Sequence, residues 1–116
     1  MDKDKLKQVM YNLLSNSLKY SKVNEEILLT LKCENDSIII EVNDNGIGIS
    51  EKDLPFIFER FYRSDESRDK NTGGAGIGLT IVKAITEAHM GTINVYSTLG
   101  EGSTFVLTFP ESMFIL

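Results

Sequence analysis

The amino-acid sequence predicts an α+β fold, a two-layer α/β sandwich in which about three helices cover one face of a mixed, largely antiparallel sheet. Two observations carry this prediction. Apolar residues recur at helical spacing in several stretches, and apolar runs separated by turn sequences form two hairpins. The order is helix, two strands, helices, two strands. A chain of 116 residues fits one domain, residues 1–116, with a modest core that needs no disulfide or metal.

The first helix is expected over residues 3–20, where apolar residues follow a 3,4 spacing and Asp2 or Asp4 suits the first turn. Two strands follow in "EILLTLKC" (26–33) and "SIIIEVN" (37–43), joined by the turn "END". Cys33 ends the first strand, and its side chain is expected to be buried with a packing role only. As the single cysteine, it excludes an internal disulfide and a Cys-based zinc site.

The second half of the chain begins where "DNGIGI" (44–49) breaks the second strand. "EKDLPFIFERF" (51–61) is expected to form a short helix, with Pro55 near its first turn. Residues 62–72 are polar, have no apolar anchor, and are expected to form an exposed, mobile loop. A helix over residues 79–90 follows, and "TINVYS" and "STFVLTF" form a second hairpin around "TLGEG".

Charge and composition exclude some classes of partner. The net charge of −5 argues against nucleic acid as a partner. No apolar run approaches the roughly 18 residues needed to span a membrane, and no signal peptide is visible. The single cysteine fits a reducing, cytoplasmic setting.

The stretch "TGGAGIGL" (72–79) places four glycines directly before a helical pattern. Glycines that open a helix are typical of an anion site, because the N–H groups of the first turn are unpaired and the helix dipole is positive there. The stretch matches neither the P-loop nor the Rossmann pattern, so on its own it also fits a plain turn at a helix start.

Two further stretches each allow two interpretations. Asn12, Asn16 and Lys19 fall within an arc of roughly 60° on the first helix, with Tyr20 at its edge. This row is either a solvated face or a set of ligands for a cation, a phosphate and a planar base. Asp44 in "DNGIGI" is either an ordinary strand-end acid or a carboxylate beside a glycine-made slot that accepts the amine of adenine.

Four stretches in this order, "NLLSNSLKYS", "DNGIGI", "FERFYR" and "GGAGIGLTIVK", resemble the N, G1, F and G2 boxes of the catalytic domain of sensor histidine kinases. That domain belongs to the GHKL ATPase group, which includes gyrase and MutL. The resemblance runs from about Asp4 to Pro110. It implies a Bergerat-type ATP-binding fold with a mobile ATP lid over about residues 62–76, and ATP and Mg²⁺ as cofactors.

The resemblance also implies a role for individual residues. Asn16 would coordinate Mg²⁺ through its side-chain oxygen, Lys19 would contact a phosphate, and Asp44 would accept the adenine amino group. Asn12, Asn16 and Lys19 are the expected catalytic residues. The expected ATP-binding residues are Asn12, Asn16, Lys19, Tyr20, Asp44, Gly46, Gly48, Ile49, Phe58, Arg63, Gly74, Gly76, Ile77, Gly78, Leu79, Ser103 and Thr104. Gly46 and Gly48 would leave room for the ring, and Ser103 or Thr104 would hold the adenine from the sheet.

The N box indicates which ATP chemistry to expect. Hydrolysing relatives carry a glutamate four residues before the Mg²⁺ asparagine, and here Asn12, which cannot act as a base, stands at that position. The chain therefore resembles a protein-histidine kinase that passes the γ-phosphoryl group on. The alternatives are a nucleotide-sensing or docking module without transfer, and a serine-directed GHKL kinase.

The acceptor histidine of the family lies outside this sequence, in a separate helical dimerisation domain. The only histidine here, His89, is expected to be structural, because the helix dipole favours histidine near a helix C-terminus. The resemblance implies a parent homodimer anchored in the bacterial inner membrane, with this domain in the cytoplasm and monomeric when isolated. The dimerisation domain, and through it a response regulator, are the implied partners.

Overall fold

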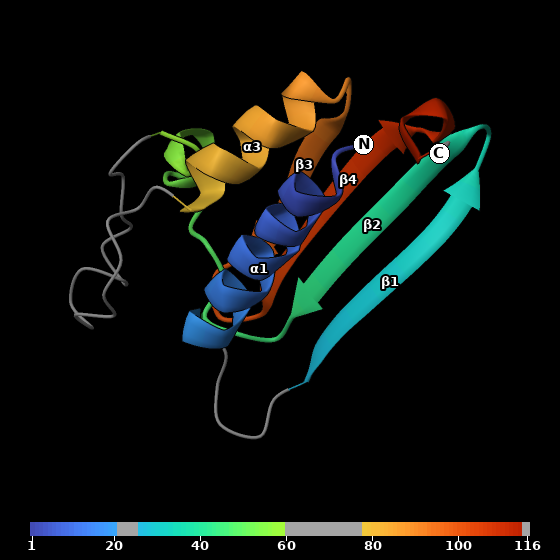
Figure 1. Ribbon diagram of the computed structural model, residues 1–116. Coiled ribbons are helices and arrows are strands. Elements are labelled where there is room, and N and C mark those ends of the chain that lie inside the picture. Colours follow the sequence, from blue (N-terminus) through green and yellow to red (C-terminus); the bar gives the residue numbers. More distant parts are fainter. Residues whose placement is uncertain (21–25, 60–77, 115–116) are drawn as a thin grey trace.

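The computed structural model describes residues 1–20, 26–59 and 78–114 (Figure 1). Its helices and strands are α1 (Lys3–Tyr20), β1 (Ile27–Glu34), β2 (Ser37–Asp44), α3 (Gly78–Ala88), β3 (Thr92–Thr98) and β4 (Gly102–Pro110). The strands form one sheet in the order β1-β2-β4-β3, and every described pair is antiparallel. Both α-helices lie on the same face of the sheet (Figure 1), so the expected α+β sandwich is confirmed.

The core fills the space between the sheet and the two helices. Residues paired across antiparallel strands share a face, so the register gives apolar rows on the helix side. The most buried row joins Val42 and Phe105, and the next joins Ile40 and Leu107. The helices complete the core with buried side chains from α1 and α3, which are Val9, Leu13, Val82 and Ile85.

The two helices are tied together at the N-terminus of α1. The carboxylate of Asp2 caps this helix, since its Oδ1 accepts the N–H groups of Lys5 at 3.2 Å and Asp4 at 2.8 Å. These hydrogen bonds hold the pKa of Asp2 below its ordinary value. The N–H of Asp2 in turn donates to Nε2 of His89 at 3.5 Å, and Nδ1 of His89 bonds the carbonyl of Ile85 at 2.8 Å. His89 thus has the structural role expected of it.

Helix α3 ends two residues earlier than expected, because Met90 leaves the helix in the left-handed conformation with φ +62. The N–H of Gly91 bonds the carbonyl of Thr86 at 2.8 Å, and that of Met90 bonds Glu87 at 3.1 Å. These two bonds make a Schellman motif with methionine at the position that glycine usually takes. Gly91 is needed for packing, since a Cβ there would overlap the ring of Phe109.

The short helix expected over residues 51–61 is not present in the described part of this range, so the prediction is wrong there. Only Leu54–Phe56 form a single 3-10 turn. The hydroxyl of Ser50 donates to the carboxylate of the buried Asp53 at 2.7 Å, and the N–H of Asp53 bonds the carbonyl of Ser50. These local bonds favour a turn, and Pro55 has no N–H with which to extend it into a helix.

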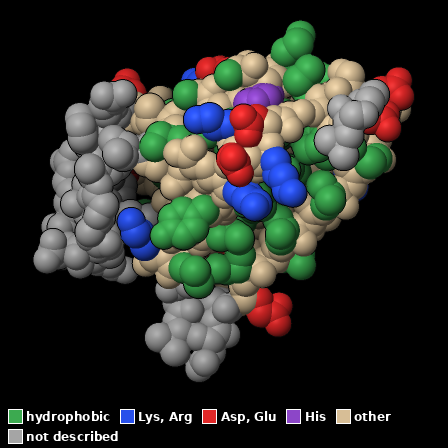
Figure 2. Space-filling model, viewed as in Figure 1, with side chains coloured by type: hydrophobic (Ala, Val, Ile, Leu, Met, Phe, Trp, Pro, Cys, Tyr) green, Lys and Arg blue, Asp and Glu red, His purple; other side chains and the backbone are tan. Residues whose placement is uncertain are grey.

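Cys33 is exposed, so the prediction that its side chain is buried is also wrong. β1 is an edge strand, and in Figure 1 neither helix covers it. Leu29 and Leu31 pair with the buried Val42 and Ile40 and so face the helix side, yet they are 50% and 69% exposed. Hydrophobic side chains therefore remain visible along this edge and over α1 in Figure 2. No helix in the described part of the chain has both the length and the apolar character to cross a membrane.

Candidate functional site

On the helix-facing side of the sheet, the apolar cross-strand rows are followed, at one end of the strands, by a row of three polar side chains. Asp44 of β2 pairs with Ser103 of β4, and Ser103 pairs with Ser97 of β3, so all three share this face. Asp44 is 5% and Ser103 is 7% exposed. Buried polar groups at the end of an apolar core are costly unless they have partners, so this row is the first candidate for a binding site.

Asp44 is held by the loop that follows β2. Its Oδ1 accepts the N–H of Gly46 at 2.9 Å, a contact within the "DNGIGI" stretch. This bond orients the carboxylate at the strand end. The charged oxygen atoms of Asp44 can accept hydrogen bonds but, when ionised, cannot donate them.

Gly48 has a packing role at the turn between β3 and β4. Its φ is +74, and a Cβ there would overlap the carbonyl oxygen of Thr98. The N–H of Gly100 bonds the carbonyl of Ile47 at 2.7 Å, which joins the same two loops. Glycine at position 48 therefore makes room for the turn between β3 and β4, and its expected place beside the purine ring stays a prediction.

The choice between Ser103 and Thr104 is decided by the register of β4. Neighbouring residues of a strand point to opposite faces, so Thr104 lies on the face away from the helices. Its Oγ1 accepts a hydrogen bond from the side-chain amide of Asn43, its cross-strand neighbour. Ser103 is therefore the residue beside Asp44 on the helix-facing side, and the expected adenine contact from the sheet stays a prediction that the register favours for Ser103.

A hollow of about 230 Å³ opens at this end of the sheet. It lies between the end of β2 and the turn that joins β3 to β4. Its lining is mostly polar and includes the three members of the row, but most of the other lining residues belong to the opposite face of the strands, and these are Asn43, Tyr96, Thr98, Gly102 and Thr104. The hollow therefore opens largely on the face away from the helices, whereas Asp44 and Ser103 are buried on the helix side.

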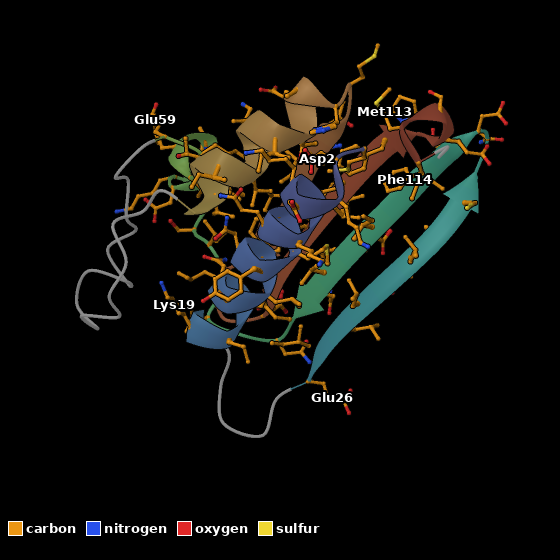
Figure 3. The ribbon with its side chains drawn as sticks, in the orientation of Figure 1. Asp2, Lys19, Glu26, Glu59, Met113 and Phe114 are labelled. Atoms are coloured by element: carbon orange, nitrogen blue, oxygen red, sulfur yellow. The ribbon has the colours of Figure 1, made fainter. Side chains whose placement is uncertain are left out.

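The asparagine row of α1 meets the start of α3. Asn12 and Asn16 are half-buried, and a Cβ at Gly78 would lie 3.8 Å from Oδ1 of Asn12. Gly78 is the first residue of α3, where backbone N–H groups have no partner within the helix. Lys19 is exposed in the last turn of α1, at the end of this helix opposite Asp2 (Figure 3). An amide oxygen, an ammonium group and the N–H groups of a helix's first turn are groups that suit a phosphate and its cation.

Other expected site residues are less central or lie outside the description. Ile49, Phe58 and Leu79 are partly buried and pack against the core. The backbone carbonyl of Phe58 accepts the hydroxyl of Thr80 at 2.8 Å, which joins this residue to the first turn of α3. Tyr20 ends α1, but its side chain is not described. Residues outside the description are Arg63, Gly74, Gly76, Ile77 and the whole lid range 62–76.

Sequence reasoning missed one member of the row, Ser97. Its signal was the alternation of β3, where Ile93 and Val95 face the core and Ser97 takes the next position on that face. A polar residue that ends an apolar alternation can mark the boundary of a site. Its meaning depended on the cross-strand register, which brings Ser97 beside Ser103.

Comparisons of the sequence and of the structure with known proteins lead to the same family. The model of the family described as "Histidine kinase-, DNA gyrase B-, and HSP90-like ATPase" matches residues 1–113. Sensor histidine kinase WalK of Bacillus subtilis is 41% identical over 112 residues, which are 95% of this chain and 18% of WalK. The chain thus spans about a fifth of the length of the curated relatives it matches.

Two solved structures have the same fold. The mycobacterial sensor histidine kinase MprB aligns with a TM-score of 0.82 and 26% identity, over 95% of this chain and 72% of MprB. Full-length ShkA in complex with AMPPNP aligns with a TM-score of 0.79 and 30% identity, over 91% of this chain and 21% of ShkA. The similarity therefore covers nearly the whole chain in both sequence and structure.

Proposed function

We infer that the chain, which belongs to the family of histidine kinase-, DNA gyrase B- and HSP90-like ATPases, is the catalytic, ATP-binding domain of a sensor histidine kinase. We propose that it binds Mg²⁺–ATP and donates the γ-phosphoryl group to a histidine on a separate dimerisation domain. The observation that carries the proposal is the buried carboxylate of Asp44, which lies beside Ser103 at the end of β2 and is held by the N–H of Gly46.

The base of the nucleotide is the part that the sheet recognises. Asp44 offers acceptor oxygens, and the exocyclic amine of adenine offers two N–H donors. Guanine has a carbonyl oxygen at the same position, which a carboxylate repels. The complex of ShkA with AMPPNP, an ATP analogue, supports an adenine nucleotide as the ligand of the fold.

The phosphates are held, in this proposal, between α1 and the start of α3. The N–H groups at Gly78 and the ammonium of Lys19 offset negative charge, and the neutral amide of Asn12 lies close by without repelling the triphosphate. Asn12 also leaves no carboxylate base at this position to activate water. These residues hold ATP for transfer to a protein acceptor.

A magnesium ion fits the residues present. Within the described ranges no group of three or more His, Cys, Asp or Glu side chains comes together, so a metal here takes few protein ligands. Mg²⁺ is commonly bound in this way, because it keeps waters and phosphate oxygens as ligands. Asn16 would supply the amide oxygen, and the bound ion would neutralise charge on the phosphates.

The rest of the parent protein completes the proposed activity. The relatives are several times longer than this chain, which leaves room for the dimerisation domain that carries the acceptor histidine. We expect the parent to be a homodimer in the bacterial inner membrane, with this domain in the cytoplasm. The phosphoryl group would pass from the acceptor histidine to a response regulator, and no nucleic acid takes part.

Calorimetric titration of the wild-type chain and an Asp44→Asn variant with ATP and GTP tests the proposal. The wild type should bind ATP in preference to GTP. The variant should bind ATP about 10-fold to 100-fold more weakly, because a hydrogen bond to a charged acceptor contributes about 1.5–3 kcal/mol. Asp36→Asn, in the turn between β1 and β2 at the far end of the sheet, is the matched control.

The control variant should bind ATP like the wild type, and circular dichroism should show that all three proteins are folded. Equal affinity of the wild-type chain for ATP and GTP would contradict the assignment of Asp44 as the residue that selects the base.

A further inference from the structure

The hydroxyl of Ser97 is surrounded by three hydrogen-bond partners. It accepts the N–H of Ile49 at 2.7 Å and donates to the carbonyl oxygen of Gly102 at 2.8 Å. Its oxygen also lies 2.9 Å from Oγ of Ser103. A serine hydroxyl has one proton and two lone pairs, so these three contacts use its full capacity.

The direction of the bond between the two serines follows from this count. A carbonyl oxygen cannot donate, so the single proton of Ser97 goes to Gly102. The N–H of Ile49 occupies one lone pair of Ser97, which leaves the other to accept from Ser103. Ser103 therefore donates its only proton to Ser97 and keeps two lone pairs.

This arrangement sets the hydrogen-bond character of the slot. Asp44, next to Ser103 on the same face, is an acceptor when ionised, and one of its oxygens already holds the N–H of Gly46. With the proton of Ser103 turned toward Ser97, both residues offer only acceptors to a ligand. A group that binds between them must bring two hydrogen atoms, as an exocyclic amine does, or as does a water molecule that donates to both.

We propose that Ser97 is a positioning residue for base selection, because it turns the hydroxyl proton of Ser103 away from the slot and makes the slot acceptor-only. This inference rests on the proposed function, that of adenine binding at Asp44, and extends it to a residue that never touches the base. Ser97 rejects 6-oxo purines by denying them a donor. Without Ser97, the hydroxyl of Ser103 would be free to donate a hydrogen bond to the carbonyl of a 6-oxo purine, even with Asp44 in place.

The test compares ATP with inosine triphosphate (ITP), which carries a carbonyl in place of the amine, in calorimetric titrations with Mg²⁺. In Ser97→Ala the proton of Ser103 is free to turn toward the slot and donate to the carbonyl. The preference for ATP over ITP should then fall about tenfold, the value of roughly one hydrogen bond. Ser97→Thr keeps the hydroxyl and should keep the preference.

Two further variants separate positioning from general damage. Ser103→Ala removes the acceptor without supplying a donor, so it should weaken ATP while leaving ITP as weak as before. Ser37→Ala, at the opposite end of β2, is the matched control and should change neither affinity. Circular dichroism checks the fold of each variant.

Each outcome has a distinct meaning. A wild-type chain that binds neither nucleotide overturns the proposed function itself. A wild-type chain that prefers ATP, with the same preference in Ser97→Ala, overturns this inference and leaves the proposed function standing. If Ser97→Ala does not fold, Ser103→Ala decides, because weaker binding of ITP in this variant would mean that Ser103 donates to the carbonyl of ITP, which overturns the inference.

Discussion

At the scale of single residues, the helix layer contains a polar group that nothing in the described structure satisfies. Ser17 is fully buried on α1, one helical turn beyond the core residue Leu13, and its hydroxyl has no hydrogen-bond partner. An unpaired buried hydroxyl costs about 1–3 kcal/mol relative to one that is hydrated. This serine therefore lowers the stability of the nucleotide-free chain.

Ser17→Ala should raise the free energy of unfolding by about 1–2 kcal/mol, through loss of the unpaired hydroxyl and a small gain in helix propensity. Urea unfolding followed by circular dichroism, without nucleotide, measures the change. Ser15→Ala on the same helix, where the serine is only half-buried, is the control for propensity alone. Equal gains in the two variants would show that burial of the Ser17 hydroxyl carries no cost.

How much of the site could be predicted depends on whether a residue's position follows from local sequence. Asp44 was identifiable, because an acidic residue that ends an apolar strand before glycines is unusual in local sequence. The choice of Ser103 over Thr104 depends on the register between β2 and β4, and the role of Ser97 on the register between β3 and β4. Register joins residues far apart in the chain, so no local pattern contains it.

At the scale of elements, the end of α3 has two neighbouring positions that each favour glycine, and only one of them is a glycine. The motif needs a left-handed residue at Met90, and the neighbouring strand leaves no space for a Cβ at Gly91. The single glycine stands where packing demands it, and a methionine occupies the strained position. Holding a residue with a Cβ in the left-handed region costs about 1 kcal/mol or more.

Met90→Gly should therefore raise the free energy of unfolding by about 0.5–1 kcal/mol, the strain relieved less the extra freedom of glycine in the unfolded chain. The side chain is 72% exposed, so little packing is lost. Thermal or urea unfolding measures the effect. Met90→Ala keeps the Cβ and the strain, and a gain in this variant as large as in Met90→Gly would rule out backbone strain as the cause.

The elements themselves were largely predictable, whereas the position of each strand in the sheet was not. The bounds of α1 and both hairpins followed from periodicity and turn residues. Cys33 ends an apolar strand pattern, which predicted its burial. Its exposure follows from the edge position of β1, beyond the reach of either helix. Edge and central strands can carry the same local pattern.

At the scale of the whole molecule, the proposed phosphate site and the only histidine of the sequence lie at opposite ends of α3. Gly78 begins this helix beside Asn12, and His89 follows its last residue. A helix of 11 residues spans about 16 Å at roughly 1.5 Å per residue. Both ring nitrogens of His89 are engaged, Nδ1 with Ile85 and Nε2 with Asp2, so the ring is held at the N-terminal end of α1.

The chain alone should accordingly bind ATP and incorporate no acid-labile phosphate. In-line attack requires an imidazole next to the γ-phosphoryl group, and the separation along α3 is several times too large for contact. Incubation with γ-labelled ATP and Mg²⁺, followed by an alkaline gel and autoradiography, measures the incorporation. A separate helical domain with an H-E/D acceptor motif, added to the same reaction, should become labelled and is the positive control. A labelled band on the chain alone that disappears in His89→Gln would mean that the helix moves far enough to bring His89 to the nucleotide, which contradicts the rigid arrangement described.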